Sequence, residues 1–309
     1  MLSTLSRSQM LQRLASRYGM ASSGGFARRF IAGETVEDAV AAARSLETRG
    51  RRITLDYLGE SVATVEEATA AAREYGRLIG VLVAAGVERN LSLKLTQLGL
   101  DIDQATCIDN LRRILEPAQR HDVFVRIDME RSAYTAQTLE VFETLWRLDY
   151  RNIGIVLQSC LHRTDGDVHR MNELGARVRL VKGAYHEPAD VAHQKKADVD
   201  AAYLRQMQQL LSHGNYPAFA THDERIHQEV RRAAAARNLR DDAYEFQLLY
   251  GIRRDLQETL LAGGNRVRVY VPFGHQWFPY FMRRLDERPA NILFVLSALV
   301  GEWRSPHGP

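Results

Sequence analysis

The feature that most constrains the fold is a unit that repeats from residue 52 onward, in which a short apolar strand precedes an amphipathic helix. The predicted strands are Arg52–Leu58, Leu91–Leu95, Val123–Glu130, Ile153–Gln158, Val178–Lys182, Ala218–His222, Tyr244–Leu249 and Val267–Val271. Helical stretches such as Val65–Ala85 and Asp255–Ala262 separate them. Eight strands that alternate with helices predict an α/β fold, a parallel (βα)8 barrel of the TIM type.

The length of 309 residues fits one such barrel with a short additional segment. We expect an N-terminal helical arm over residues 1–50 and a catalytic barrel over residues 51–309. The first 33 residues contain five arginines and no acidic residue. Three interpretations of them stay open: a helix packed on the barrel, a helix on a membrane surface, or a transit peptide.

Composition excludes several classes of function. A net charge of +3 without a basic tract argues against a nucleic-acid partner. The two cysteines, Cys107 and Cys160, have neither disulfide nor zinc-site spacing, which favours a reducing, cytoplasmic compartment. The longest apolar run is too short to span a membrane.

Alternate residues of the predicted strands form an apolar face and a polar face. The apolar face is expected to pack against the outer helices. A barrel interior is normally apolar, and buried polar groups are costly unless they pair or meet a ligand. The polar face therefore predicts either an active site at the C-terminal ends of the strands or a network of internal salt bridges. Its members are Asp56, Lys94, Arg126, Asp128, Glu130, Gln158, Arg179, His222, Glu245, Gln247, Arg268 and Tyr270.

Two kinds of chemistry can be weighed on these residues. A desolvated lysine, Lys94 or Lys182, would suit a Schiff-base lyase, but Asp128 and Glu130 would keep an ammonium nearby charged. The stretch THDERIH at 221–227 offers two histidines and two acids without metal-ligand spacing, so no metal is expected. The chain also lacks the glycine fingerprint of dinucleotide-binding folds and a P-loop.

The stretch RLVKGAYHEP, residues 179–188, offers another way to hold a nucleotide cofactor. Arg179 points inward, Lys182 ends the strand, and Gly183 with Ala184 leaves the backbone open to close approach. Two cations beside exposed backbone suit a pyrophosphate or a flavin, whose reduced form carries negative charge. An ordinary glycine turn at the end of a strand is the alternative.

A charged helix near the C-terminus, YFMRRLDERPAN at 280–291, has a polar face of its own. Tyr280, Arg283, Arg284 and Glu287 share that face, and Pro289 ends the helix. Two guanidiniums braced by one carboxylate would form a fork that grips a second carboxylate. A solvated face of ion pairs is the alternative.

Taken in order, LSLKLTQLGLDID, VRIDME, IVLQ, RLVKGAY, FATHD, EFQLLYG, RVYVPFG and YFMRRLDERPAN resemble the proline dehydrogenase family in its short, monofunctional form. The resemblance runs from about Leu55 to Asn291. It implies a distorted (βα)8 barrel, non-covalent FAD, and oxidation of L-proline to Δ1-pyrroline-5-carboxylate in proline catabolism. It also implies a quinone as electron acceptor.

The same resemblance implies roles for individual residues. Asp128 and Arg179 would be catalytic, and Glu287 would position the two arginines of the helix. Proline would be surrounded by Lys94, Leu249, Tyr270, Tyr280, Arg283 and Arg284. The flavin contacts would be Met129, Gln158, Arg179, Lys182, Gly183, Ala184, Thr221, His222 and Gln247. His186 departs from the family, which often has tryptophan or lysine at that position.

The resemblance also implies the position of the charged helix and the location of the protein in the cell, and two alternative functions stay open. The charged helix follows the eighth strand and is expected to lie across the barrel mouth. A quinone acceptor suggests a cytoplasmic protein with transient contact to the membrane surface, or a mitochondrial one in a eukaryote. The rivals are the Schiff-base lyase with Lys94 or Lys182, and a barrel kept as a non-catalytic binding protein.

Overall fold

A computed structural model describes residues 26–59 and 61–287, and at Phe26 and residues 285–287 it describes the backbone alone. Residues 1–25, which form half of the predicted N-terminal arm, therefore lie outside the described residues. The arm's remaining part contains the 3-10 helix η1 (Phe26–Arg29) and helix α3 (Val36–Glu47).

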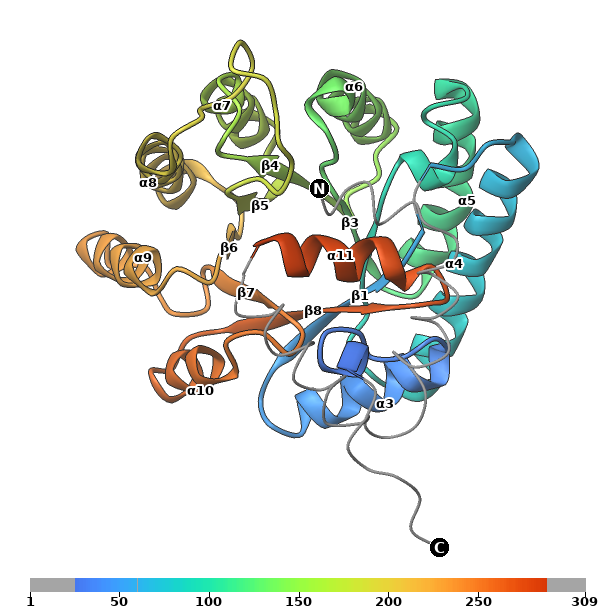
Figure 1. Cartoon of the computed structure of the whole chain (residues 1–309), viewed down its shortest axis with the longest axis horizontal. Helices are drawn as coiled ribbons and strands as arrows, with labels where there is room; N and C mark the ends of the chain where they lie inside the picture. Colours follow the sequence, from blue (N-terminus) through green and yellow to red (C-terminus); the bar gives the residue numbers. More distant parts are fainter. Residues whose placement is uncertain (1–25, 60, 288–309) are drawn as a thin grey trace, which may run out of the picture.

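Eight parallel strands close into a barrel in their sequence order, which confirms the predicted (βα)8 fold (Figure 1). Strand β8 pairs with β1, with Val269 opposite Ile53. The strands are β1 (Arg52–Tyr57), β2 (Asn90–Leu93), β3 (Phe124–Ile127), β4 (Ile153–Gln158), β5 (Arg177–Val181), β6 (Ala218–Ala220), β7 (Glu245–Leu249) and β8 (Val267–Phe273).

The connections between the strands carry the outer helices, which surround the barrel (Figure 1). The 3-10 turn η2 (Thr96–Leu98) follows β2. The α-helices are α4 (Val65–Ala85), α5 (Gln104–Arg120), α6 (Ser132–Arg147), α7 (Thr164–Leu174), α8 (Lys196–His213), α9 (Glu224–Ala236), α10 (Arg254–Ala262) and α11 (Trp277–Glu287). None of the helices within residues 26–59 and 61–287 is both long enough and apolar enough to cross a membrane.

Helix α4 illustrates how local sequence sets these boundaries, and its predicted limits are confirmed. The Thr64 side chain accepts a hydrogen bond from the Glu67 backbone N–H, which caps the start of the helix. Gly86 ends it with a positive φ of 66°, a conformation that glycine adopts without steric cost. Between these caps, Ala68, Ala72 and Tyr75 form part of the buried face.

Several strands end earlier than the sequence predicted, because the chain turns out of the ladder once it reaches the barrel mouth. Strand β2 ends at Leu93, β3 at Ile127 and β6 at Ala220. Lys94, Asp128 and His222 therefore lie in the loops just beyond the strands rather than within them. This correction places them at the C-terminal end of the barrel, where barrel enzymes bind their substrates.

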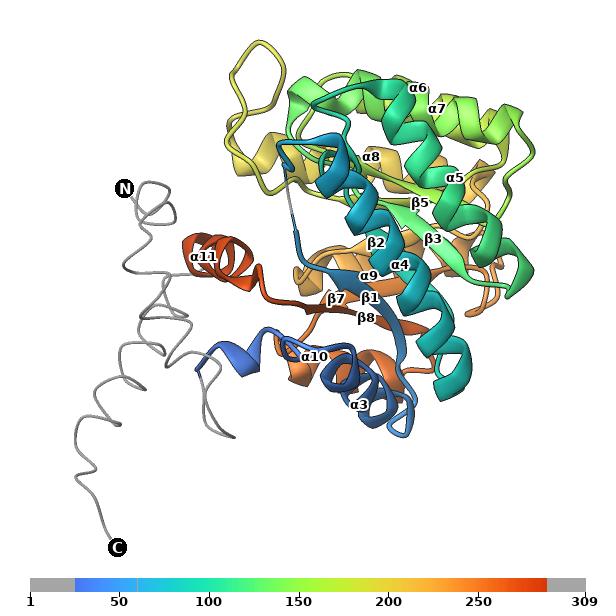
Figure 2. The same cartoon turned by 90° about the vertical axis from the view of Figure 1, so that its right-hand side faces the viewer.

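The barrel is distorted at its last helix, as the resemblance implied. Helix α3, which precedes β1, packs on the outside against β8 and β1. Helix α11, which follows β8, lies instead across the mouth of the barrel (Figures 1 and 2). The expected helix over the mouth is thus confirmed, and its usual place in the outer ring is taken by a segment from the N-terminal side.

Helix α11 rests on the chain that precedes α3. Trp277 and Phe281 of α11 form one apolar cluster with Ala27, Phe30 and Ile31. The indole Nε1 of Trp277 donates a hydrogen bond of 2.9 Å to Glu34 Oε1. The N-terminal segment therefore supports the helix that covers the mouth.

The predicted two faces of the strands are also present. Outward residues such as Ile53, Leu55, Val125 and Val269 are completely buried against the helices. Inside the N-terminal end of the barrel lies a charged layer, which we call the barrel floor: Arg268, Glu245 and Glu88. Arg268 donates to Glu245 Oε1 at 2.7 Å and to Glu88 Oε1 at 2.8 Å. The salt-bridge interpretation thus holds at the floor.

The charges of the barrel floor change the pKa of Glu245. Burial alone would raise the pKa of Glu245, but the Arg268 guanidinium and hydrogen bonds from Gln247 and Tyr216 hold it at about 2. A carboxyl whose pKa is lowered on folding stabilises the protein above its unfolded pKa, and this stabilisation is lost as pH falls toward 2. For this single group the pH-dependent contribution is on the order of 3 kcal/mol.

We predict that Arg268→Met lowers the free energy of unfolding by about 3–5 kcal/mol near pH 8, because it leaves a buried carboxylate without its cation. Burial would then raise the folded-state pKa of Glu245 above its unfolded value, so the loss should shrink as pH falls toward 5. Urea unfolding at pH 8 and pH 5 measures both effects.

The double variant Arg268→Met/Glu245→Gln is the control for this prediction, because it removes the buried charge along with its partner. It should cost less than the sum of the two single variants. A loss in Arg268→Met that is equal at the two pH values would show that the charge of Glu245 is not responsible.

Candidate active site

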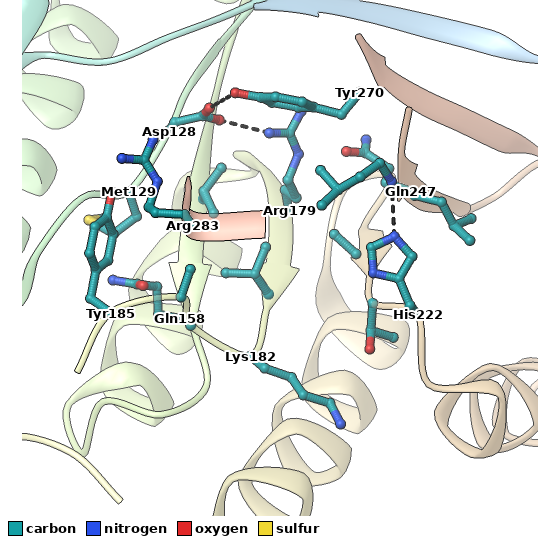
Figure 3. A pocket seen from close by; sticks show the side chains of 18 of the residues that line it. Asp128, Met129, Gln158, Arg179, Lys182, Tyr185, His222, Gln247, Tyr270 and Arg283 are labelled. Atoms are coloured by element: carbon teal, nitrogen blue, oxygen red, sulfur yellow. Dashed lines mark hydrogen bonds and ion pairs between the residues drawn. The ribbon is translucent and has the colours of Figure 1, made fainter. Parts of the chain in front are cut away.

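A cavity of about 340 Å³ lies at the C-terminal ends of the strands, under helix α11 (Figure 3). It brings together every side chain that the sequence assigned to substrate or cofactor, except Glu287, whose side chain lies outside the described residues. Its walls include Lys94, Asp128, Met129, Gln158, Arg179, Lys182, Gly183, Ala184, Thr221, His222, Gln247, Leu249, Tyr270, Tyr280, Arg283 and Arg284.

At the base of the cavity, Asp128 holds Arg179 and Tyr270 together (Figure 3). Arg179 Nη1 donates to Asp128 Oδ1 at 2.7 Å, and the Tyr270 hydroxyl donates to Asp128 Oδ2 at 2.7 Å. Arg179 Nη2 also donates to Ser92 Oγ at 3.0 Å. Its guanidinium carbon lies 5.3 Å from the centre of the Tyr270 ring. Side chains from β2, from the loop just after β3 and from β8 thereby fix one buried cation.

The protonation of Tyr270 follows from its surroundings. Burial, together with the carboxylates of Asp128 and Asp56, raises the pKa of Tyr270 well above its usual range. The phenol therefore stays protonated and remains a hydrogen-bond donor to Asp128. One hydrogen-bond donor of this cluster is unsatisfied: the buried Nε of Arg179 has no hydrogen-bond partner among the described residues.

Lys94 pairs with an acid that the sequence had not assigned to the site. Its Nζ lies 3.2 Å from Asp56 Oδ2, and Asp56 is completely buried. Burial raises the pKa of Asp56, whereas the ammonium of Lys94 opposes that rise. Glu130, which was expected near Lys94, accepts hydrogen bonds from the Thr96 backbone N–H and hydroxyl, the latter at 2.6 Å.

Lys182 also has acidic partners. Its Nζ lies 2.6 Å from Asp200 Oδ1 and 2.9 Å from Asp223 Oδ2. A Schiff-base lysine must lose its proton to become nucleophilic, and neighbouring carboxylates favour the charged form. The pairing of both Lys94 and Lys182 with carboxylates argues against the lyase alternative.

One wall of the cavity includes Gly183, a position that packing restricts to glycine. Gly183 has a φ of +115°, and a Cβ at this position would lie 2.3 Å from Cys160 Sγ. Only glycine fits both the conformation and the space. Beside it, Gln158 Nε2 donates to the Glu130 carbonyl at 2.8 Å, which fixes the orientation of the Gln158 amide.

Gln247 presents a further unsatisfied group at the opposite wall. Its Nε2 donates to Glu245 of the barrel floor at 2.5 Å. Its buried Oε1 has no hydrogen-bond partner among the described residues. An acceptor left over inside a protein is costly unless a ligand supplies the donor.

The two histidines of THDERIH have different environments. His222 lines the cavity, and its Nε2 accepts a hydrogen bond of 3.1 Å from the Leu249 N–H. His227 lies in the core with its ring centre 4.7 Å from that of Phe246, and burial lowers its pKa to about 4. Within the described part of the chain, no three His, Cys, Asp or Glu side chains are grouped to hold a metal ion.

Helix α11 brings Tyr280, Arg283 and Arg284 over the cavity from above. The Arg284 guanidinium lies 5.0 Å from the centre of the Tyr280 ring, and both side chains are buried. Arg283 extends toward Asp128 (Figure 3). The shared face that the sequence predicted for these residues is therefore turned toward the barrel rather than toward solvent.

Sequence reasoning missed two residues that the structure brings to the site. Asp56 appeared on the polar face, but only the fold reveals that it is the partner of Lys94. Tyr185 lines the cavity next to Met129 (Figure 3). It belongs to the motif RLVKGAY, so the motif itself carried a signal for it.

Comparison with known proteins gives a consistent result. The family model described as proline dehydrogenase matches residues 39–296. Proline dehydrogenase 1 of Bacillus subtilis subsp. natto is 40% identical over 96% of this chain and 97% of its own length. Proline dehydrogenase of Deinococcus radiodurans is 44% identical over 89% of this chain and 90% of its own.

The fold has solved counterparts as well. A structure of proline utilization A (PutA) from Bdellovibrio bacteriovorus, inactivated by N-propargylglycine, superposes with a TM-score of 0.79 at 28% identity. The match covers 84% of this chain and 32% of that longer chain. The present chain thus spans about a third of that PutA protein.

Proposed function

The chain belongs to the proline dehydrogenase family, and from this premise we propose that it oxidises L-proline to Δ1-pyrroline-5-carboxylate with non-covalent FAD and passes the electrons to a quinone. It is an oxidoreductase of proline catabolism. The observation that carries the proposal is that one cavity contains both a set of side chains suited to a flavin and a set suited to an amino-acid carboxylate.

The flavin set fits FAD through its unsatisfied buried atoms. The isoalloxazine ring carries an N–H donor between two carbonyl acceptors, so it can satisfy both an acceptor and a donor of the protein. Gln247 Oε1 is such an acceptor, and Arg179 Nε is such a donor. Gly183 lines the cavity, and without a side chain it presents backbone atoms there. Met129, Gln158, Lys182, Ala184, Thr221 and His222 complete the flavin contacts that we propose.

The carboxylate set lies on α11 and in the wall next to it. We assign the proline carboxylate to Arg283 and Arg284, because a pair of guanidiniums matches a carboxylate with parallel hydrogen bonds. Hydrogen bonds to charged groups contribute about 1.5–3 kcal/mol each, so this contact would dominate substrate binding. Tyr270, Tyr280 and Leu249 supply walls for the apolar ring, Lys94 adds a nearby cation, and Glu287 would brace the arginines.

FAD, when bound, supplies the two-electron acceptor for the hydride that leaves the proline ring carbon next to nitrogen. In this proposal Arg179 and Asp128 act at the reacting end. Arg179 keeps a positive charge where negative charge develops on the reduced ring. Asp128 orients that guanidinium through Nη1 and holds the Tyr270 hydroxyl, so the site is preorganised before substrate arrives.

The electron acceptor and the cellular location belong to the same proposal. A quinone dissolves in membranes, and we therefore propose a cytoplasmic enzyme that touches the membrane surface transiently. Co-sedimentation with anionic vesicles, compared for the full chain and a chain without residues 1–25, would show whether the N-terminal segment makes that contact.

We expect the purified protein to be yellow and to release FAD on denaturation. Since no covalent link is proposed, the flavin should appear in the supernatant after the protein is precipitated. The visible spectrum and chromatography of the released flavin measure this, and proline added without oxygen should bleach the flavin bands. A colourless protein, or one that retains its flavin after precipitation, would contradict the proposal.

A second prediction concerns the arginine pair. Arg284→Lys keeps the positive charge but replaces a planar fork by a point charge, so it should raise the KM for proline about tenfold. The turnover number should change much less, because the reacting atoms lie at the other end of the substrate. Steady-state kinetics measure both constants.

Arg232→Lys is the matched control, because Arg232 is an exposed residue of α9 that pairs with Glu229 outside the cavity. It should leave both constants unchanged. If Arg284→Lys lowers turnover without affecting KM, Arg284 does not hold the carboxylate.

A further inference from the structure

The connection between β5 and α8, residues 182–195, has two halves with different surroundings. Both ends of the connection are fastened to the turn after β4. At its start, the Cys160 N–H donates to the Lys182 carbonyl. Near its end, the His193 N–H donates to the Cys160 carbonyl, and Leu161 pairs with Ala192 in an antiparallel bridge. The near half contains Gly183, Ala184 and Tyr185, which line the cavity.

The side chain of Glu187, two residues after Tyr185, ties this part of the chain to the start of α6. Its Oε1 accepts a hydrogen bond of 2.8 Å from the Ser132 backbone N–H, and its Oε2 accepts a short hydrogen bond from the Ser132 hydroxyl. Ser132 is the first residue of α6, 55 positions earlier in the chain. We call this contact the Glu187–Ser132 clip.

The start of α6 explains why the clip forms. The N-cap residue, Arg131, makes no side-chain capping bond, and the first turn contains no acidic residue. The first backbone N–H groups of a helix need acceptors, and the positive end of the helix dipole favours a carboxylate. The Glu187 carboxylate, which comes from a different loop, provides both the hydrogen-bond acceptor and the negative charge.

The clip spans the cavity wall. Ser132 follows Asp128, Met129 and Glu130 at the end of β3, whereas Glu187 follows Gly183, Ala184 and Tyr185 at the end of β5. The end of β4 lies between them, where Gln158 Nε2 bonds the Glu130 carbonyl. Tyr185 and Met129 stand next to each other above Gln158 (Figure 3).

We propose that Glu187 is a positioning residue that holds the Gly183–Tyr185 segment against the β3 wall and thereby slows the release of the flavin. The inference rests on the proposed function, in that it takes FAD to be the ligand of this wall. Glu187 does not line the cavity, so its effect must pass through the segment it holds.

The test uses the holoenzyme and follows flavin release rather than turnover. Dilution of the holoenzyme into flavin-free buffer, with the return of free-flavin fluorescence, gives the release rate. Glu187→Ala removes the carboxylate and should speed release about tenfold, the factor expected when a charged hydrogen-bonded cap is lost. Glu187→Gln keeps the hydrogen-bonding shape without the charge and should speed release about threefold.

Two further variants separate positioning from general damage. Asp190→Ala removes an exposed acid of the same loop that makes no hydrogen bond or ion pair within residues 26–59 and 61–287, and it should leave the release rate unchanged. Ser132→Ala should speed release, and combined with Glu187→Ala it should add less than its effect alone. With FAD in excess, all variants should keep the wild-type turnover number and KM for proline.

The outcomes distinguish this inference from the proposed function. If the wild-type protein carries no FAD, the proposed function fails and the inference fails with it. If the wild type carries FAD and both Glu187 variants release it at the wild-type rate, only the inference is overturned. The inference would also be overturned if the Glu187 variants lost as much free energy of unfolding in urea as their faster release corresponds to in free energy. Glu187 would then stabilise the fold generally.

Discussion

A charge inside a closed barrel must find a counter-charge or hydrogen-bond acceptors inside the same barrel, and this constraint organises the interior. Arg126 donates to the backbone carbonyls of Ile155 and Arg177, whereas the other buried cations of the barrel interior meet carboxylates. At the floor, Arg268 meets Glu245 and Glu88, and the layer is complete without a ligand. Toward the mouth, Arg179 meets Asp128 and Lys94 meets Asp56. There the pairing stops short, because Arg179 Nε and Gln247 Oε1 remain without protein partners among the described residues. This incomplete layer is where we propose that the flavin binds.

The site divides its work between parts of different origin. The strand ends hold Asp128, Arg179 and Gln247 rigidly, since each is bonded to a neighbour on another strand or to the floor below. The arginines come from α11, which stands on Ala27, Phe30 and Ile31. In the proposed function, the groups at the reacting atoms are thus set by the barrel, whereas the groups assigned to the carboxylate are set by a helix with its own support.

The sequence predicted the fold and the residues of the site, but not how those residues pair. Alternating strands and helices predicted the barrel because each unit has its own periodicity and caps, as α4 shows. The polar face of the strands predicted which residues meet inside it. The pairing of Lys94 with Asp56, and of Glu130 with Thr96, was not predictable, because alternation specifies a face and not the angular position of one strand relative to another. The Glu187–Ser132 clip was hidden for a similar reason: it joins two loops that no local pattern relates.

The position of α3 has a consequence for the order in which the molecule is made. This helix lies near the start of the chain, yet its buried residues Val36, Ala39, Val40 and Ala43 face a core completed by β8, near the end of the described residues. At ordinary rates of synthesis, roughly ten to forty seconds separate the emergence of the two elements from the ribosome. Throughout that interval the apolar face of α3 has no native partner in β8. The barrel can therefore close only after β8 has been translated. A chain interrupted before β8 would leave part of the apolar face of α3 exposed to solvent instead of forming a smaller stable fold.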